Sequence, residues 1–230
     1  MQNDSNFDLD QLFLENVTLL HQGRDLILKS VDFDLPTDQT VVIESSDPQN
    51  AVNFLKFIAG QLPCRSGRIL WNGLDVFSEE AAVDPRQVMG SCFEHQCLPS
   101  KKTVSEMLSL WISAEETDSV LEDFEMNSSR HIKMNELDFA SQKLIYLVIS
   151  VLKNPQFLIL EDPAQGLSEK QWLMYLDYIQ FKQRRGYLRH IYMTNHQEKA
   201  LNHLEHNKIY IEEGLIYIDE SMPLKKVAHF

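Results

Sequence analysis

The chain has 230 residues, of which 43% are hydrophobic and 24% are charged, as in ordinary soluble globular proteins. Its net charge of -13 argues against binding nucleic acid or an anionic lipid surface through a broad basic face. No apolar run approaches the roughly 20 residues that cross a bilayer. The polar residues 1–5 resemble no targeting peptide. The three cysteines favour reduced thiols over a disulfide framework.

The first part of the chain predicts strands and one helix. Apolar residues alternate loosely at 12–17 and again at 26–35, which predicts two strands. The β-branched run at 40–44 predicts a buried strand, and apolar residues at helical spacing from 52 to 59 predict a helix after it. Residues 66–73 predict a strand that closes in an Asn-Gly turn, which is a strong hairpin signal.

The second part alternates helices with strands. Residues 103–130 are predicted to be mainly helical, and 139–153 form a long apolar helix that ends at Asn154-Pro155, because proline lacks the amide hydrogen. The remaining predictions are a strand at 157–160, a helix at 169–185, a strand at 190–194 and a hairpin of 209–211 with 215–218. This order predicts one α/β unit over residues 1–230, a parallel sheet with an antiparallel β portion and a helical insert at about 100–153.

The loop between the strand at 40–44 and the following helix is the most informative stretch. A strand, a short polar loop and a helix form the frame of the phosphate-binding motif G-x-x-x-x-G-K-[ST]. The residues at its two glycine positions, its lysine and its Mg²⁺-binding hydroxyl are Ser45, Asn50, Ala51 and Val52. Asp47 followed by Pro48 predicts a helix capped by its own carboxylate. That carboxylate would occupy the backbone donors that a phosphate needs.

From Leu14 to about Ile218, the chain resembles the nucleotide-binding domain of ATP-binding-cassette (ABC) transporters. The resemblance rests on segments that stand in the family's order and at its spacings, namely 14–17, 55–60, Ser66-Gly67-Arg68-Ile69, Asn72-Gly73, 152–163 and Gly166-Leu167. It implies a P-loop NTPase-like mixed α/β sheet with an antiparallel β portion and a helical subdomain.

At the family's nucleotide-binding positions the chain differs from the consensus. The adenine-loop residue is His21, and the glutamine that senses the γ-phosphate is Glu94. The signature Leu-Ser-Gly-Gly-Gln aligns with Leu137, Asp138, Phe139, Ala140 and Ser141. A carboxylate thus replaces the phosphate-binding serine, and a phenylalanine stands where glycine lets the backbone approach the ligand. The switch histidine aligns with Asn195, and a slip of one residue would place His196 there.

The acidic pair that ends the predicted strand at 157–160 is inverted. The family has Asp-Glu-Pro, whereas this chain has Glu161-Asp162-Pro163. Each carboxylate moves by one C–C bond, about 1.5 Å, and a misplacement on the order of 1 Å can cost roughly a hundredfold in rate. We therefore expect no functional catalytic group, no metal site and no bound cofactor.

These residues lead to three functional hypotheses. The first is a catalytically inactive cassette, not an enzyme, that serves as a scaffold or regulator in an ABC transporter-type membrane complex. The second is an ATP-binding subunit with non-consensus motifs that binds Mg-ATP and hydrolyses it weakly or not at all. The third is a soluble interaction module with the ABC fold.

The resemblance also implies partners and a location. The partners would be a cytoplasmic helix of a membrane subunit and a second cassette, in a homodimer or heterodimer, with no nucleic acid and no direct membrane insertion. The chain would be cytoplasmic and peripheral to the cytoplasmic membrane. The residues expected to contact the membrane subunit are Leu98, Met107, Leu108 and Trp111, and the alternative is that they pack the core of the helical subdomain.

Overall fold

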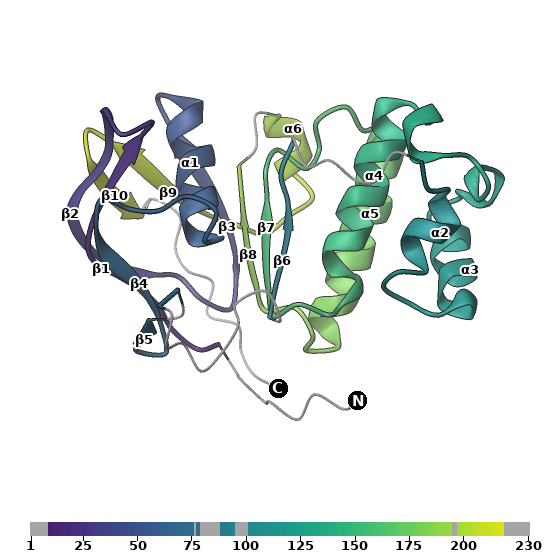
Figure 1. Ribbon diagram of the computed structural model, residues 1–230, viewed down its shortest axis with the longest axis horizontal. Coiled ribbons are helices and arrows are strands. Elements are labelled where there is room, and N and C mark those ends of the chain that lie inside the picture. Colours follow the sequence, from purple (N-terminus) through teal and green to yellow (C-terminus); the bar gives the residue numbers. More distant parts are fainter. Residues whose placement is uncertain (1–8, 76, 79–87, 95–100, 195–196, 219–230) are drawn as a thin grey trace.

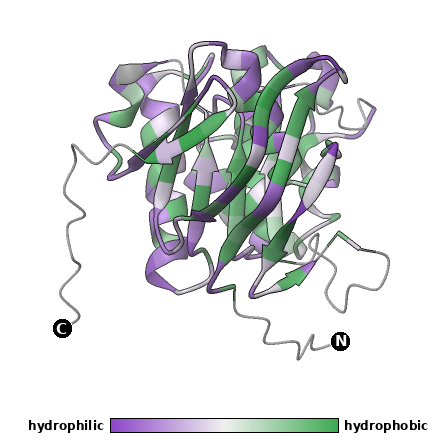
Figure 2. Ribbon diagram, turned by 90° about the vertical axis from the view of Figure 1, so that its left-hand side faces the viewer, coloured by the Kyte–Doolittle hydropathy of each residue, from purple (hydrophilic) through white to green (hydrophobic). Residues whose placement is uncertain are grey.

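The computed structural model describes residues 9–75, 77–78, 88–94, 101–194 and 197–218. Its strands form two sheets (Figure 1). The smaller sheet is antiparallel and has the order β2-β1-β4-β5. Its strands are β1 (Leu12–His21), β2 (Asp25–Leu35), β4 (Ser66–Trp71) and β5 (Leu74–Asp75). Figure 2 shows that apolar and polar residues alternate along these strands, as expected for a sheet with one buried face.

The larger sheet is mixed and has the order β10-β9-β3-β8-β7-β6. All neighbouring strands are parallel except the terminal hairpin of β9 and β10. Its strands are β3 (Thr40–Ser45), β6 (Met89–Cys92), β7 (Phe157–Leu160), β8 (His190–Met193), β9 (Asn207–Glu212) and β10 (Leu215–Ile218). The amide of Lys29 on β2 donates to the carbonyl of Gly214, 2.9 Å away, which joins the two sheets.

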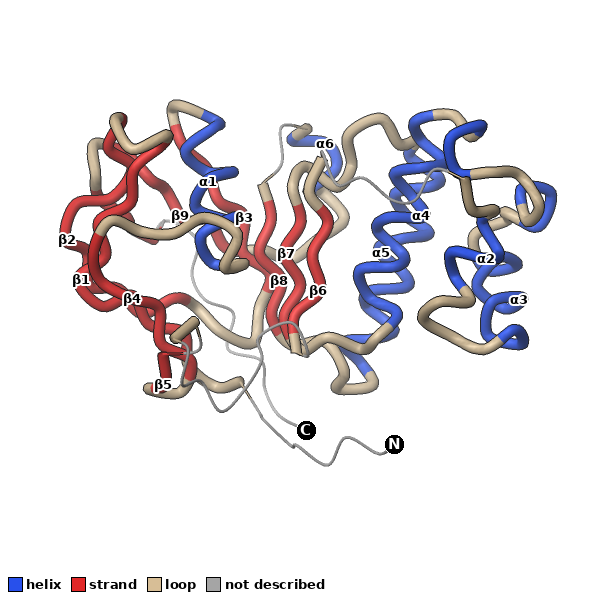
Figure 3. Tube along the Cα trace, in the orientation of Figure 1, coloured by secondary structure: helices blue, strands red, loops and turns tan. Residues whose placement is uncertain are grey.

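The helices divide between the two faces of the larger sheet (Figures 1 and 3). The helix α1 (Pro48–Ile58) lies between the sheets, and α4 (Phe139–Leu152) and α5 (Glu169–Arg184) cover the opposite face. Beyond α4 and α5 lie α2 (Val104–Leu108) and α3 (Ala114–Asp123). The short elements are α6 (Glu198–Leu201) and the 3-10 turns Asn127–Ser129 and Met134–Glu136. None of the helices in the described part of the chain has the length and apolar character of a membrane span.

Two hydrophobic clusters form the core, one on each side of the larger sheet. Alternate residues of β3 divide between them, because Val41 and Ile43 pack with α1 whereas Val42 packs with α4 and α5. All four residues of β7 and of β8 are buried, and all of them except His190 are apolar. The mixed sheet predicted from the sequence is thus confirmed.

Most predicted elements have the expected positions, and the exceptions have physical causes. The Asn-Gly hairpin forms, with Leu70 of β4 opposite Asp75 of β5. The strand β6 was not predicted, because Met-Gly-Ser-Cys has neither β-branched residues nor alternation. Gly90 in this strand runs against α4, and a Cβ atom there would lie 1.9 Å from the carbonyl oxygen of Ser150. The predicted helical stretch 103–130 is divided into α2, α3 and a 3-10 turn.

Candidate functional site

Four loops meet at the carboxyl edge of the larger sheet, because β3, β8, β7 and β6 are parallel neighbours. They are residues 45–52 after β3, Glu94 after β6, Glu161 and Asp162 after β7, and Thr194 after β8. In open α/β sheets ligands bind at this edge. The sheet therefore brings the predicted loop, the Glu94 position and the acidic pair to one place.

The first turn of α1 has its backbone donors occupied by Asp47. The carboxylate oxygen Oδ1 of Asp47 accepts from the amide of Gln49 at 3.0 Å, and its carbonyl oxygen accepts from the amide of Asn50 at 2.9 Å. Pro48, between them, has no amide hydrogen. The predicted carboxylate cap is confirmed, and an anion could bind this helix start only by displacing it.

The side chains further along the loop face the core. Ala51 and Val52, at the lysine and hydroxyl positions, are only 3% and 6% exposed. The hydroxyl of Ser45 donates to the carbonyl of Ile211 on β9, 2.7 Å away. Neither a cation nor a free hydroxyl is therefore present among these three side chains. The residues in this loop do not fit the family's way of holding a phosphate.

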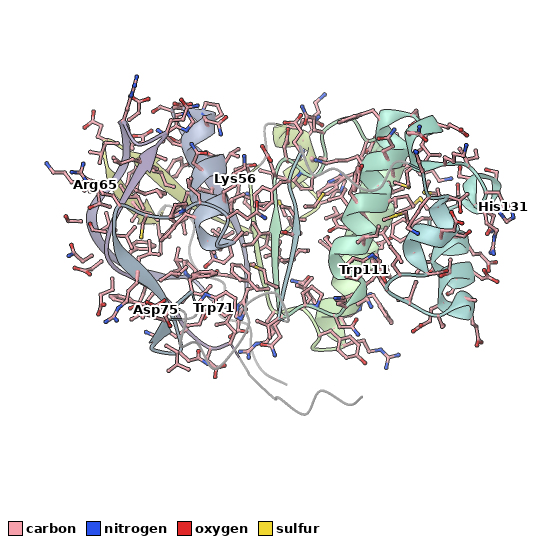
Figure 4. The ribbon with its side chains drawn as sticks, in the orientation of Figure 1. Lys56, Arg65, Trp71, Asp75, Trp111 and His131 are labelled. Atoms are coloured by element: carbon pink, nitrogen blue, oxygen red, sulfur yellow. The ribbon has the colours of Figure 1, made fainter. Side chains whose placement is uncertain are left out.

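The positive charge of α1 is that of Lys56, in the last turn of the helix and away from the loop. Its ammonium nitrogen lies 6.0 Å from the centroid of the Phe93 ring, next to Glu94, and Figure 4 shows it between α1 and the larger sheet. It stands five positions after Ala51 on the helix, a rise of about 7.5 Å. Its charge therefore lies beside the end of β6 rather than at the loop.

His21, the predicted adenine-contacting residue, is linked to α1. Its Nδ1 lies 2.5 Å from the side-chain nitrogen of Asn53, and the Asn53 oxygen accepts from the side-chain amide of Gln49 at 3.3 Å. Sequence reasoning did not identify Asn53, which is 5% exposed and is a polar residue on the buried face of an apolar helix. That misfit of polarity was the available signal.

The acidic pair after β7 is buried, and both of its residues form hydrogen bonds. Glu161 and Asp162 are 7% and 5% exposed. The carboxylate of Glu161 accepts from the backbone amide of Glu94 at 2.9 Å, so it fixes the loop after β6. The amide of Asp162 donates to the hydroxyl of Thr194 at 3.1 Å, and Asp162 has φ 42, which is uncommon for a residue other than glycine. The Glu161 carboxylate and the Asp162 main chain thus take part in a network that joins β6, β7 and β8.

Lys143 on α4 is a further buried charge at this edge. It is 4% exposed, and its ammonium group donates to the main-chain carbonyl of Glu161 at 3.1 Å. The nearby Cys92 thiol is buried, which raises its pKa to about 11, so the thiol stays protonated and is a poor nucleophile. Sequence reasoning missed Lys143, although a lysine within the apolar run of α4 is a recognisable signal.

The signature positions lie at the start of α4. Asp138 caps this helix: its Oδ1 accepts from the Ser141 amide at 2.7 Å, and its Oδ2 accepts from the Ser141 hydroxyl at 3.2 Å. Phe139 is 54% exposed and contacts Gly166, where an added Cβ would lie 2.5 Å from the Phe139 ring. Leu137 is partly buried against the helical cluster, and Ala140 is half-buried in the first turn. A carboxylate therefore also occupies the start of this second helix.

The expected docking residues separate into two groups. Met107 and Leu108 are 1% and 0% exposed and pack inside the cluster of α2, α3, α4 and α5, so their assignment to a docking surface is corrected to a core position. Their helical spacing turns them inward against α4. Trp111 is 39% exposed, and the ammonium of Lys153 lies 4.3 Å from its ring centroid. Leu98, Asn195 and His196 lie outside the described residues.

The chain matches the model of the ABC transporter family over residues 28–165, which is more than half of its length. It therefore belongs to this family, and its fold is that of an ABC nucleotide-binding domain. Solved structures agree with this assignment. The ATP-binding subunit of an ABC transporter superposes with a TM-score of 0.73 at 17% identity, over 91% of this chain and 90% of the other. A bacterial Atm1-family ABC exporter with ATP bound superposes with a TM-score of 0.74 at 14% identity. The match covers 90% of this chain and 38% of the exporter chain.

Two curated relatives are similar to this chain in sequence. The chain is 26% identical over 203 residues to the cytochrome c biogenesis ATP-binding export protein CcmA of Reclinomonas americana, across 83% of this chain and 86% of the relative. It is 29% identical over 160 residues to the zinc import ATP-binding protein ZnuC of Ruegeria sp. (strain TM1040). This match covers 68% of this chain and 59% of the relative.

These matches correct one expectation from the sequence. The expectation that the chain is not an enzyme is wrong, because the family and the relatives are ATP-binding subunits. The hypothesis of an inactive scaffold was inferred from unusual residues at single positions, and the matches over most of the chain outweigh that inference. They agree with the second hypothesis, an ATP-binding subunit of a transporter.

Proposed function

We propose that this chain is the ATP-binding subunit of an ABC transporter-type complex and carries non-consensus nucleotide-binding motifs. In this role it pairs with a second cassette and contacts a cytoplasmic helix of a membrane subunit, on the cytoplasmic face of the membrane. The observation that carries the proposal is the family match over residues 28–165, together with a fold that superposes on ATP-binding subunits over nine-tenths of the chain.

The proposed nucleotide is Mg-ATP, bound weakly. Family membership supports the nucleotide, and the occupied start of α1 supports the low affinity. A hydrogen bond to a charged group contributes about 1.5–3 kcal/mol, and each 1.4 kcal/mol is about a tenfold change in the dissociation constant. Because position 51 is alanine, the affinity for the nucleotide is therefore expected to be on the order of tenfold to a hundredfold lower than that of a loop with a lysine there.

Calorimetric titration with Mg-ATP tests this proposal. The control is a grafted variant that combines Ser45→Gly, Asp47→Ser, Asn50→Gly, Ala51→Lys and Val52→Ser. We expect the grafted loop to bind at least about tenfold more tightly than the natural chain. A single Ala51→Lys change should gain little, because Asp47 still occupies the helix start and coupled parts of a site are not additive. Titrations without binding in both proteins would contradict the nucleotide assignment.

The proposed contact with the membrane subunit lies near residues 94–111, with Trp111 as its exposed aromatic anchor. Trp111→Asp should abolish co-purification with a co-expressed membrane subunit and leave the melting temperature of the isolated chain nearly unchanged. Met107→Asp is the matched control, since Met107 lies in the core and its replacement should lower the melting temperature. A large drop in melting temperature for Trp111→Asp, with co-purification intact, would exclude a docking role.

A further inference from the structure

The ends of α4 and α5 form a surface where cations and aromatic rings contact one another. We call it the basic aromatic face and define it by Lys153, Phe181, Lys182, Arg184, Arg185 and Tyr187. The last turn of α5 contributes most of it, and Gly186, with φ 74, reverses the chain so that the Tyr187 amide donates to the Lys182 carbonyl at 3.1 Å. The ammonium of Lys182 donates to the Asn154 side chain at 2.6 Å, which ties this turn to the end of α4.

Cation–π contacts hold the rings of this face in place. The Lys182 ammonium lies 5.8 Å from the Tyr187 ring centroid, and the Arg185 guanidinium lies 5.4 Å from that of Phe181. The two rings remain 46% and 43% exposed. The ammonium of Lys153 lies 4.3 Å from the centroid of the Trp111 ring, so the face extends to this tryptophan. Each ring therefore contacts a cation and is still open to solvent.

Helix electrostatics and solubility explain only part of this arrangement. Cations in the last turn of a helix are favoured by its dipole, but two exposed aromatic rings are not. Elsewhere on the chain, cations such as Arg68, Arg130 and Lys170 are paired with carboxylates. Within the described residues, no carboxylate lies within ion-pair distance of Lys153, Arg184 or Arg185, although the chain carries a net charge of -13.

We propose that the basic aromatic face binds an acidic segment of a protein partner. Arginine and aromatic side chains are the residues that most often dominate protein interfaces, and the cations complement carboxylates. A broad anionic surface such as a membrane is disfavoured, because α3 beside the face is acidic and Glu116 lies close enough to influence Lys182. A narrow peptide segment needs to contact only a few cations, such as the exposed Arg184 and Arg185. The proposal does not depend on nucleotide binding.

The test uses the full chain and a short fluorescent peptide of glutamate, aspartate and tyrosine, measured by fluorescence anisotropy. We expect saturable binding that weakens as salt is added. The double variant Arg184→Ala/Arg185→Ala should weaken it about tenfold or more, and Tyr187→Ala should weaken it as well. The matched control Arg24→Ala/Arg65→Ala removes the same charge from exposed positions elsewhere and should leave the affinity within about twofold.

Several results would overturn the proposal. One is the absence of peptide binding to the natural chain. Another is a loss of affinity in the control variant as large as in the double variant. A third is a lysine-rich peptide that binds as tightly as the acidic one. Binding to vesicles that contain anionic lipid, lost in the double variant and without peptide binding, would assign the face to a membrane surface instead. Sedimentation that shows a dimer broken by the double variant would assign it to a second copy. Unchanged melting temperatures show that each variant is folded.

Discussion

Gly90 shows how a single position without a side chain sets the distance between β6 and α4. A Cβ atom there would lie 1.9 Å from the Ser150 carbonyl oxygen, which is backbone and cannot move aside alone. We predict that Gly90→Ala lowers the free energy of unfolding by about 1–3 kcal/mol or more, because α4 must shift away from the sheet. Urea denaturation of the purified chain measures this loss.

Gly73→Ala is the matched control for this prediction. Gly73 has φ 78, but an added Cβ meets nothing within 4 Å, so only backbone strain of roughly 1 kcal/mol is expected. Losses of equal size in the two variants would mean that β6 and α4 adjust freely. In that case the close approach would not constrain the acidic pair, which Glu94 and Lys143 connect to these elements.

At the scale of elements, His190 joins β8 to the segments that precede β1 and β3. The ring is fully buried, its Nδ1 accepts from the Asp38 amide at 2.8 Å, and its Nε2 donates to the Leu9 carbonyl at 2.7 Å. These two partners require the neutral ring. Burial lowers the pKa of His190, although Asp38, Asp10 and the Leu9 carbonyl oppose this and Arg189 adds to it.

This arrangement predicts an acid-sensitive stability. The unfolded chain binds a proton at His190 near pH 6.5, whereas the folded chain does so only at a lower pH. The free energy of unfolding should therefore fall as the pH drops below about 6.5, with a slope of up to about 1.4 kcal/mol per pH unit until the lowered pKa is reached. Asp38, whose pKa is lowered chiefly by its hydrogen bond from Arg189, adds a separate loss below its ordinary value of 3.8.

Urea titrations at a series of pH values between neutral and mildly acidic conditions check this prediction. His190→Gln should flatten the dependence in that range, since it removes the titrating ring. His131→Gln, at an exposed position, is the control and should leave the profile of the natural chain unchanged. A profile that is flat in the natural chain would show that His190 does not control its acid stability.

At the scale of the whole molecule, the cluster around α4 joins the helical subdomain to the larger sheet. Residues of α2, α3, α4 and α5 pack there with residues of β6, β7 and β8. The tryptophans report on separate parts: Trp71 on the smaller sheet, Trp111 on the helical subdomain (Figure 4) and Trp172 on α5. We propose that these parts unfold as one cooperative unit.

Three single-tryptophan variants, with the other two tryptophans replaced by phenylalanine, test this cooperativity. In each variant, we expect the fluorescence of the remaining tryptophan and the circular dichroism to change at the same urea concentration. An earlier fluorescence transition at Trp111 would instead show that the helical subdomain opens independently of the sheets. The comparison within each variant serves as its own control for altered stability.

The sequence by itself determined the features that depend on neighbouring residues. The β-branched and apolar runs define β3, β7 and β8, the Asn72-Gly73 pair defines a hairpin, and Asp47-Pro48 defines the start of α1. These signals are local, because strand and helix preferences, turns and caps act over a few residues. Their order and spacing were also sufficient to indicate the ABC family.

Only the tertiary structure decided which side chains are available. Met107 and Leu108 proved to be core residues, His21 proved to contact Asn53, and Lys143 proved to reach the end of β7. Each of these outcomes depends on contacts between residues far apart in the chain. Local periodicity identifies the apolar face of a helix, but it does not say which neighbour covers that face or how closely two elements approach. That information arises only when the sheets and helices pack together.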